Sequence, residues 1–194
     1  MTHRSVRSLV RWFVLLAATA ASATPGQAQE REEGHPEAGE HEEQARPRHR
    51  LAIFTGNTWI PEGNHEGAID GLIEAPTLGL DYALRLGERF AISSINDVQV
   101  ASYVIEREDG SDLERERVFV TSLVLMWEAT PRLQLFAGPG LETDRHETLG
   151  LAKVGVEWVL FEPHPWDVAL NFAWDIKKEY DSIAVGLSIG RLWS

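Results

Sequence analysis

Residues 167–176 read DVALNFAWDI, a stretch in which large apolar residues alternate with small or charged ones. The even-numbered positions carry Val, Leu, Phe, Trp and Ile, while the odd-numbered positions carry only Asp, Ala and Asn. Such alternation predicts a β-strand with two different faces. Residues 183–190, IAVGLSIG, repeat the scheme, and their second face of Ala, Gly and Ser is too small to build a protein core. The bulky face is therefore expected to point outward, as in a barrel that spans a membrane.

Working outward from this stretch, the chain after residue 49 divides into strand-like segments joined by turn residues. We place eight of them at about 50–60, 75–86, 89–105, 116–128, 132–141, 148–161, 166–177 and 182–193. Tight connections follow the second, fourth and sixth segments, and mostly longer or more charged ones follow the others, at 61–74, 107–115, 143–147 and 178–181. This pattern predicts an all-β, eight-stranded antiparallel up-and-down transmembrane β-barrel with its short turns in the periplasm. Pro139 predicts a bulge or an end in the fifth segment, because proline cannot donate to a strand ladder.

The N-terminal part of the chain predicts export. A basic start, an apolar run over residues 12–21 and small residues before a cleavage point near Ala23 or Ala28 are typical of a secretory leader. The acidic stretch that follows lacks the apolar residues needed to form a core. We expect a signal peptide over 1–28, a disordered His/Glu-rich tail over 29–49 and an outer-membrane β-barrel over 50–194.

Composition excludes several classes of function. Residues 1–28 carry three arginines and no acid, so their removal would change the net charge from −12 to −15. This charge argues against nucleic acid and anionic lipid surfaces as partners, because both attract clustered Lys and Arg. The absence of cysteine excludes a disulfide scaffold, thiol catalysis and Cys-ligated zinc. No cofactor is predicted.

Aromatic residues gather at the predicted strand ends, as in the interfacial girdles of membrane barrels. On the proposed topology the periplasmic girdle holds Phe90, Trp127, Trp158, Trp166 and Trp193, and Trp59, Tyr103 and Trp174 approach the outer rim. The alternative is that these side chains form the core of a soluble sandwich.

The inward-facing positions combine small residues with charges of both signs. The predicted lumen set is Asp81, Arg85, Asp97, Lys153, Glu157, Asp167, Asn171 and Asp175. Charges in a narrow lumen should pair, because an unpaired buried charge is costly. A structural role is therefore predicted, and the alternative is a narrow water-filled path for small cations.

Candidate catalytic residues are few. His65, Asp144 and His146 fall in the predicted outer loops, where a rim dyad would make the protein an outer-leaflet lipid-modifying enzyme. The barrel-region histidines lack a serine two residues on, the His-x-Ser pattern of lipid A deacylase barrels. We therefore predict no enzymatic activity.

The acidic tail contains candidate metal ligands. His35, His41 and His49, interleaved with glutamates, supply ligands suited to a divalent metal such as zinc, nickel or copper. Their spacings of six and eight residues match no closed site, so weak binding is expected. The alternative is a solvated spacer.

Four stretches give the chain a likeness to a known class: residues 51–58, 77–82, 137–140 and 185–193. They resemble small eight-stranded outer-membrane barrels of the OmpA/OmpX type, and among these the exported barrels with a His/Glu-rich N-terminal tail. The resemblance implies outer-membrane lipids as partners and a structural or interaction role. It also implies that the assembly machinery recognises the last strand through Trp193, although Ser194 follows it here. The alternative class is a soluble periplasmic lipocalin-like ligand-binding barrel.

Overall fold

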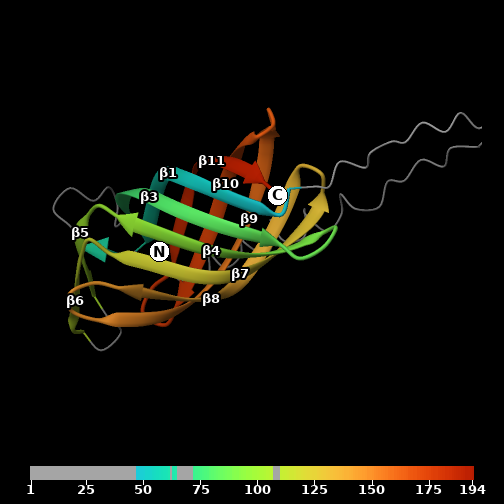
Figure 1. The fold of residues 1–194 in the computed structure, drawn as a ribbon. Helices are drawn as coiled ribbons and strands as arrows, with labels where there is room; N and C mark the ends of the chain where they lie inside the picture. Colours follow the sequence, from blue (N-terminus) through green and yellow to red (C-terminus); the bar gives the residue numbers. More distant parts are fainter. Residues whose placement is uncertain (1–46, 62, 65–71, 107–109) are drawn as a thin grey trace, which may run out of the picture. The chain divides into compact units, whose positions relative to one another are not determined.

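The computed structural model describes residues 47–61, 63–64, 72–106 and 110–194, and the fold is built from strands (Figure 1). The eight long strands are β1 (His49–Pro61), β3 (Leu72–Arg85), β4 (Phe90–Gln99), β7 (Phe119–Thr130), β8 (Leu133–Thr143), β9 (Thr148–Phe161), β10 (Trp166–Lys177) and β11 (Ser182–Trp193). The described part of the chain contains no helix with the length and hydropathy needed to cross a membrane.

These eight strands form one closed antiparallel barrel in the order β1-β11-β10-β9-β8-β7-β4-β3. The first and last strands close it: Gly56 of β1 lies opposite Gly186 of β11 on one side and Thr77 of β3 on the other. The predicted fold class is confirmed, because each strand pairs with its neighbours in an up-and-down sequence. Short turns and the C-terminus lie at one end of the barrel, here called the turn end (Figure 1).

A second, three-stranded sheet lies at the opposite end, here called the loop end (Figure 1). This cap sheet consists of β2 (Gly63–Asn64), β5 (Ser102–Glu106) and β6 (Asp112–Glu116). Three predicted boundaries are therefore wrong. The barrel strand in the segment predicted at 89–105 ends at Gln99, and the barrel strand in the segment predicted at 116–128 begins at Phe119. The connection predicted at 107–115 contains most of β6.

The error arose because the alternation continues beyond the barrel wall. Tyr103, Ile105 and Leu113 of the cap sheet are buried in an apolar cluster with residues of the barrel strands. Tyr103 is only 2% exposed, so its predicted place at the outer lipid interface is wrong. The alternation shows that one face of a strand is apolar. It does not show whether that face contacts lipid or packs on the protein itself.

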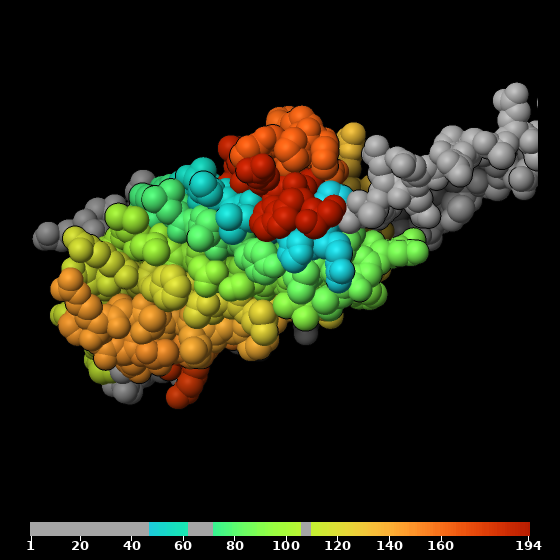
Figure 2. Space-filling model, in the orientation of Figure 1, coloured from blue at the N-terminus to red at the C-terminus, as the bar shows by residue number. Residues whose placement is uncertain are grey.

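The faces of the barrel strands are inverted relative to a soluble barrel. On β11, Leu187 and Ile189 are 43% and 55% exposed, whereas Ser188 between them is 0% exposed. The same outward exposure of large apolar residues is found on every barrel strand. Figure 2 shows β3, β4 and β7, coloured green to yellow, packed side by side along this outer surface. A soluble lipocalin-like barrel would have the opposite polarity.

Small residues in the wall make room for two aromatic rings in the lumen. Phe54 lies against Gly56 and Gly186, and Phe136 lies against Gly155, so that a Cβ at any of these glycines would overlap a ring. Pro139 neither ends its strand nor forms a bulge, because β8 continues to Thr143 and its register with β9 is unbroken at Pro139. Its side chain lies on the exposed face, where a proline ring meets lipid rather than the lumen.

Candidate functional site: the charged lumen and its capped end

The lumen contains ion pairs spread along the barrel axis. From the turn end, the first is Arg85 with Glu128, whose side chains are 3.0 Å apart. Both are partly exposed, which makes this pair the most solvated of those in the lumen. A partly solvated pair contributes little to stability, so the deeper pairs matter more.

Arg50 forms the centre of the next group. Its guanidinium donates two hydrogen bonds of 2.7 Å to the two carboxylate oxygens of Asp167 and one of 3.2 Å to Glu157. It also donates to Ser188 at 3.0 Å, and Asn171 donates to the same hydroxyl. The planar guanidinium matches a carboxylate in this two-point geometry. Four strands, β1, β9, β10 and β11, are thereby joined across the lumen.

Lys153 joins two further acids near the middle of the barrel. Its ammonium lies 2.8 Å from Asp175 and 3.4 Å from Asp97, and all three side chains are at most 9% exposed. An ammonium between two carboxylates offsets the cost of removing these charges from water. The lumen is thus occupied by paired side chains at this level.

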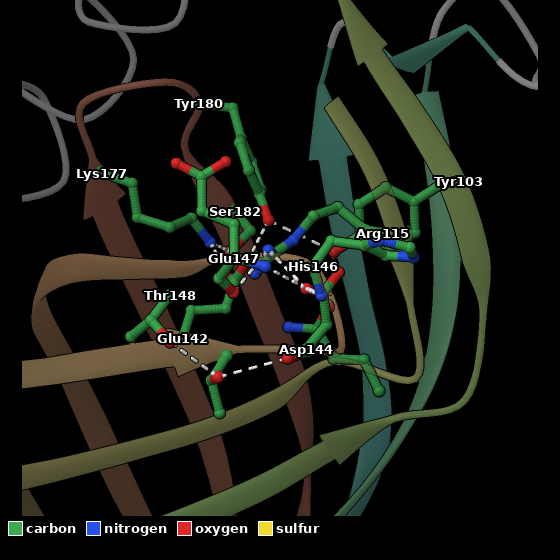
Figure 3. Close-up of polar contacts among 12 residues, drawn as sticks. Tyr103, Arg115, Glu142, Asp144, His146, Glu147, Thr148, Lys177, Tyr180 and Ser182 are labelled. Carbon is green, nitrogen blue, oxygen red and sulfur yellow. Dashed lines mark hydrogen bonds and ion pairs between the residues drawn. The ribbon is translucent and has the colours of Figure 1, made fainter. Parts of the chain in front are cut away.

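The loop end contains the most deeply buried group (Figure 3). Glu142 of β8 accepts hydrogen bonds of 2.6 Å from both Arg115 and Lys177, and the three side chains are 0% exposed. Lys177 also donates to Ser182 at 2.8 Å. Arg115 belongs to β6, so the cap sheet is tied to the barrel wall by a buried ion pair.

Two tyrosines cover this group. Tyr180 donates a hydrogen bond to Glu142, and its hydroxyl lies 3.3 Å from that of Tyr103, which donates to Gln99 at 3.1 Å. Burial, together with the negative charge of Glu142, raises the pKa of both phenols above their ordinary values, so both remain protonated donors. Apolar residues surround them, including Ile60, Ile73, Ile105, Leu113, Val118 and Leu149.

Asp144 fixes the turn between β8 and β9 against the cap sheet. Its Oδ1 accepts the backbone N–H groups of His146 and Glu147, at 2.8 and 2.9 Å, and lies 3.2 Å from Arg115. Its Oδ2 accepts the N–H of Glu116 at 3.3 Å. Burial acts to raise the pKa of Asp144, but the backbone hydrogen bonds and Arg115 outweigh it and hold that pKa below its ordinary value. The carboxylate therefore stabilises the turn through its hydrogen bonds, while the side chain of His146 is exposed.

A pocket of about 280 Å³ opens at the turn end. Its lining mixes charges of both signs with apolar side chains, including Arg48, Arg50, Arg85, Glu128, Glu162 and Met126. Opposite charges there neutralise one another, so the pocket has no clear preference for an anion or a cation. No cluster of metal ligands is found among the described residues.

The predicted lumen residues all lie on inward positions. Asp97, Lys153, Glu157, Asp167 and Asp175 are buried, and Asp81 and Arg85 are half-buried. The predicted interfacial aromatics Trp59, Phe90, Trp127, Trp158, Trp166, Trp174 and Trp193 lie on outward positions.

The structure describes only one of the three predicted metal ligands. His49 lies in β1, where it accepts or donates a 2.8 Å hydrogen bond with the Tyr82 hydroxyl and stacks on Trp193. His35 and His41 lie outside the described residues, as does His65. The metal site stays a prediction.

Sequence reasoning missed three cations of the site, Arg50, Arg115 and Lys177, and it missed Glu142, which pairs with Arg115 and Lys177. Arg50 directly follows the acidic tail, and Arg115 lies in the connection predicted at 107–115. Glu142 and Lys177 lie on the inward, small-residue face of their strands. Each lies two residues beyond the preceding inward position of its strand, so continuing the alternation would have found them.

The closed sheet, its apolar outer face and its charged lumen make the protein an integral outer-membrane β-barrel. No protein-family model matches the chain, and no curated protein matches it in sequence. Among solved structures it is similar to Ail, the attachment invasion locus protein of Yersinia pestis, with 11% identity over 76% of this chain and 99% of that one and a TM-score of 0.48.

Two other solved structures are similar to a comparable degree. The N-terminal β-barrel domain of Pseudomonas aeruginosa OprF has 10% identity over 75% of this chain and 99% of its own, with a TM-score of 0.44. Neisserial surface protein A has 10% identity over 74% of this chain and 96% of its own, with a TM-score of 0.43. At these identities and TM-scores, the likenesses carry no argument about what this protein does.

Proposed function

We propose that this protein is a closed outer-membrane barrel with a structural or interaction role, neither a pore nor an enzyme. The observation that carries the proposal is the buried group of Arg115, Glu142 and Lys177 beneath the cap sheet. It closes the loop end with paired charges and apolar side chains. A closed barrel of this kind holds the cap sheet rigidly at the outer surface, where it is available for contact with other molecules.

The pore alternative has less support. Lys153 and Arg50 are both held between carboxylates inside the lumen, so a passing ion would have to displace ion pairs whose side chains are 12% exposed or less. Purified protein in planar bilayers is expected to give no steady single-channel current. Uniform, long-lived conductance steps would contradict the proposal.

The enzyme alternative requires a carboxylate or imidazole free to act on a lipid at the rim. Asp144 is engaged by three backbone N–H groups and by Arg115, and it contacts His146 only through the main chain. Alanine variants of His65, Asp144 and His146 are expected to leave the lipid profile of the producing cells unchanged. A modified lipid that disappears with one of these substitutions would show that the enzyme reading is correct.

The soluble lipocalin-like alternative requires an apolar lumen and a polar exterior. The large apolar residues on the outward face, such as Leu78 and Leu187, instead favour a lipid environment. Carbonate extraction of membranes is expected to leave the protein in the pellet. Its release into the supernatant would favour the soluble reading.

A further inference from the structure

Charged residues are almost absent from the outward face of the barrel. Among the outward positions of the eight described barrel strands, only two are Asp, Glu, Lys or Arg: Glu74 and Arg191. Glu74 lies near the loop end, opposite Trp59. Arg191 lies near the turn end and is the single Arg or Lys that the described strands present to lipid.

Arg191 is surrounded by side chains of the periplasmic girdle. It lies opposite Trp166 of β10 and Leu51 of β1, and its guanidinium is 5.9 Å from the centre of the Trp166 ring. Trp193, two positions further along the same face, is also exposed. Tryptophan rings in such girdles lie at the level of the lipid headgroups. The indole also favours a cation over its face, which orients the guanidinium within that layer.

Among the described residues, the charge of Arg191 has no anionic partner. Its one recorded contact is the Trp166 ring, and none of the carboxylates that the structure describes pairs with it. The lumen arginines, in contrast, are all paired. At the depth of a tryptophan girdle the bilayer supplies an anion, the phosphate of a phospholipid, and the planar guanidinium binds phosphate through two parallel hydrogen bonds.

We propose that Arg191 and Trp166 form a binding site for the headgroup phosphate of a phospholipid in the leaflet at the turn end. The inference rests on the proposed membrane placement and adds the class of lipid group and the residues that hold it. Such a site binds the phosphate itself, so it does not need a lipid of net negative charge and is compatible with an acidic protein.

Two micelles with the same alkyl chain test this site. The full chain is folded in dodecylphosphocholine, which carries a phosphate, and in dodecyl maltoside, which does not, and the rate of unfolding is followed by heat-modifiable migration. Arg191→Leu places an apolar residue on an apolar face, so without a phosphate contact it should be neutral or stabilising in both. In dodecylphosphocholine, but not in dodecyl maltoside, we expect Arg191→Leu to unfold about tenfold faster than the parent protein, the effect of losing one charge-assisted hydrogen bond.

Two further variants complete the test. Arg191→Lys is expected to retain part of the effect, because it keeps the charge but not the planar geometry. Arg132→Leu removes a cation from the β7–β8 turn at the same end of the barrel and is expected to change nothing. Equal or slower unfolding of Arg191→Leu in dodecylphosphocholine would overturn the phosphate site while leaving the membrane placement intact. Failure of the parent protein to fold in either micelle would instead overturn the membrane placement.

Discussion

Arg115 and Glu142 approach to 2.6 Å with both side chains fully buried, although one belongs to the cap sheet and the other to the barrel wall. Glu142 is also bound by Lys177 and Tyr180, so one carboxylate accepts hydrogen bonds from two cations and a phenol, and Asp144 supplies Arg115 with a second carboxylate. A buried charge that loses its partner is strongly destabilising, whereas an intact pair contributes little beyond its own cost of burial. The loop end therefore depends on Glu142 more than on any one of its partners.

Glu142→Gln is expected to lower the free energy of unfolding by about 3–5 kcal/mol, because it leaves the buried Lys177 without a carboxylate and Arg115 with Asp144 alone. Arg115→Met should cost less, since Glu142 would keep Lys177 and Tyr180. Urea unfolding in lipid vesicles, followed by tryptophan fluorescence, measures both.

Glu116→Gln, in the same strand as Arg115, is the matched control for Glu142→Gln. Its pair with Arg145 spans 3.9 Å and is solvent-exposed, so its loss is expected to cost less than about 1 kcal/mol. If Glu142→Gln is no more destabilising than this control, the buried group does not hold the loop end closed.

The turn around Asp144 should give the protein an acid-sensitive contribution to stability. The folded-state pKa of Asp144 lies below its ordinary value, so the ionised carboxylate stabilises the protein at neutral pH. This contribution is lost as the pH falls through the folded-state pKa, below about pH 4. Asp144→Asn is therefore expected to be destabilised at pH 7 and to approach the parent protein at lower pH. A constant difference in urea midpoint between pH 7 and pH 3 would show that Asp144 does not titrate in this way.

The contact of Phe136 with Gly155 predicts an asymmetry between two glycines of β9. A Cβ at Gly155 would overlap the Phe136 ring and the Phe172 carbonyl, whereas one at Gly150 meets open space. Gly155→Ala is expected to cost about 1–3 kcal/mol through overpacking, and Gly150→Ala close to nothing. Equal urea midpoints for the two variants would mean that the Phe136 ring does not pack tightly against Gly155.

Much of the fold could be predicted because the residue types along a barrel strand alternate between its two faces, and this alternation is visible in the local sequence. The alternation in residues 167–176 predicts β10 to within a residue at each end, and the inward positions predicted for Lys153 and Asp175 hold buried side chains. The partners of the charges could not be predicted. Arg50 and Asp167 lie 117 residues apart and meet only because closure of the sheet brings β1 near β10. The cap sheet was missed for a related reason, since no local pattern tells which surface buries Leu113.

The last strand predicts a requirement for assembly. Trp193 lies opposite His49 and stacks on its ring at 5.6 Å, so β11 closes the barrel at the position where its terminal aromatic lies. Deletion of residues 192–194 is expected to reduce insertion into the outer membrane, measured as the heat-modifiable fraction of the membrane pellet. A truncated chain that inserts as well as the full chain would argue against a role for Trp193 in recognition.

The central claim is that the bulky face of the barrel contacts acyl chains. The chain has no cysteine, so single cysteines at Leu78 and Leu187 can carry a nitroxide without background labelling. Asp112→Cys, exposed on the cap sheet, provides the water-facing control. Collision rates in lipid vesicles test the claim directly: labels at 78 and 187 are expected to meet oxygen readily and a water-soluble nickel complex rarely, with the reverse at 112. Ready contact of the nickel complex with the labels at 78 and 187 would contradict the claim.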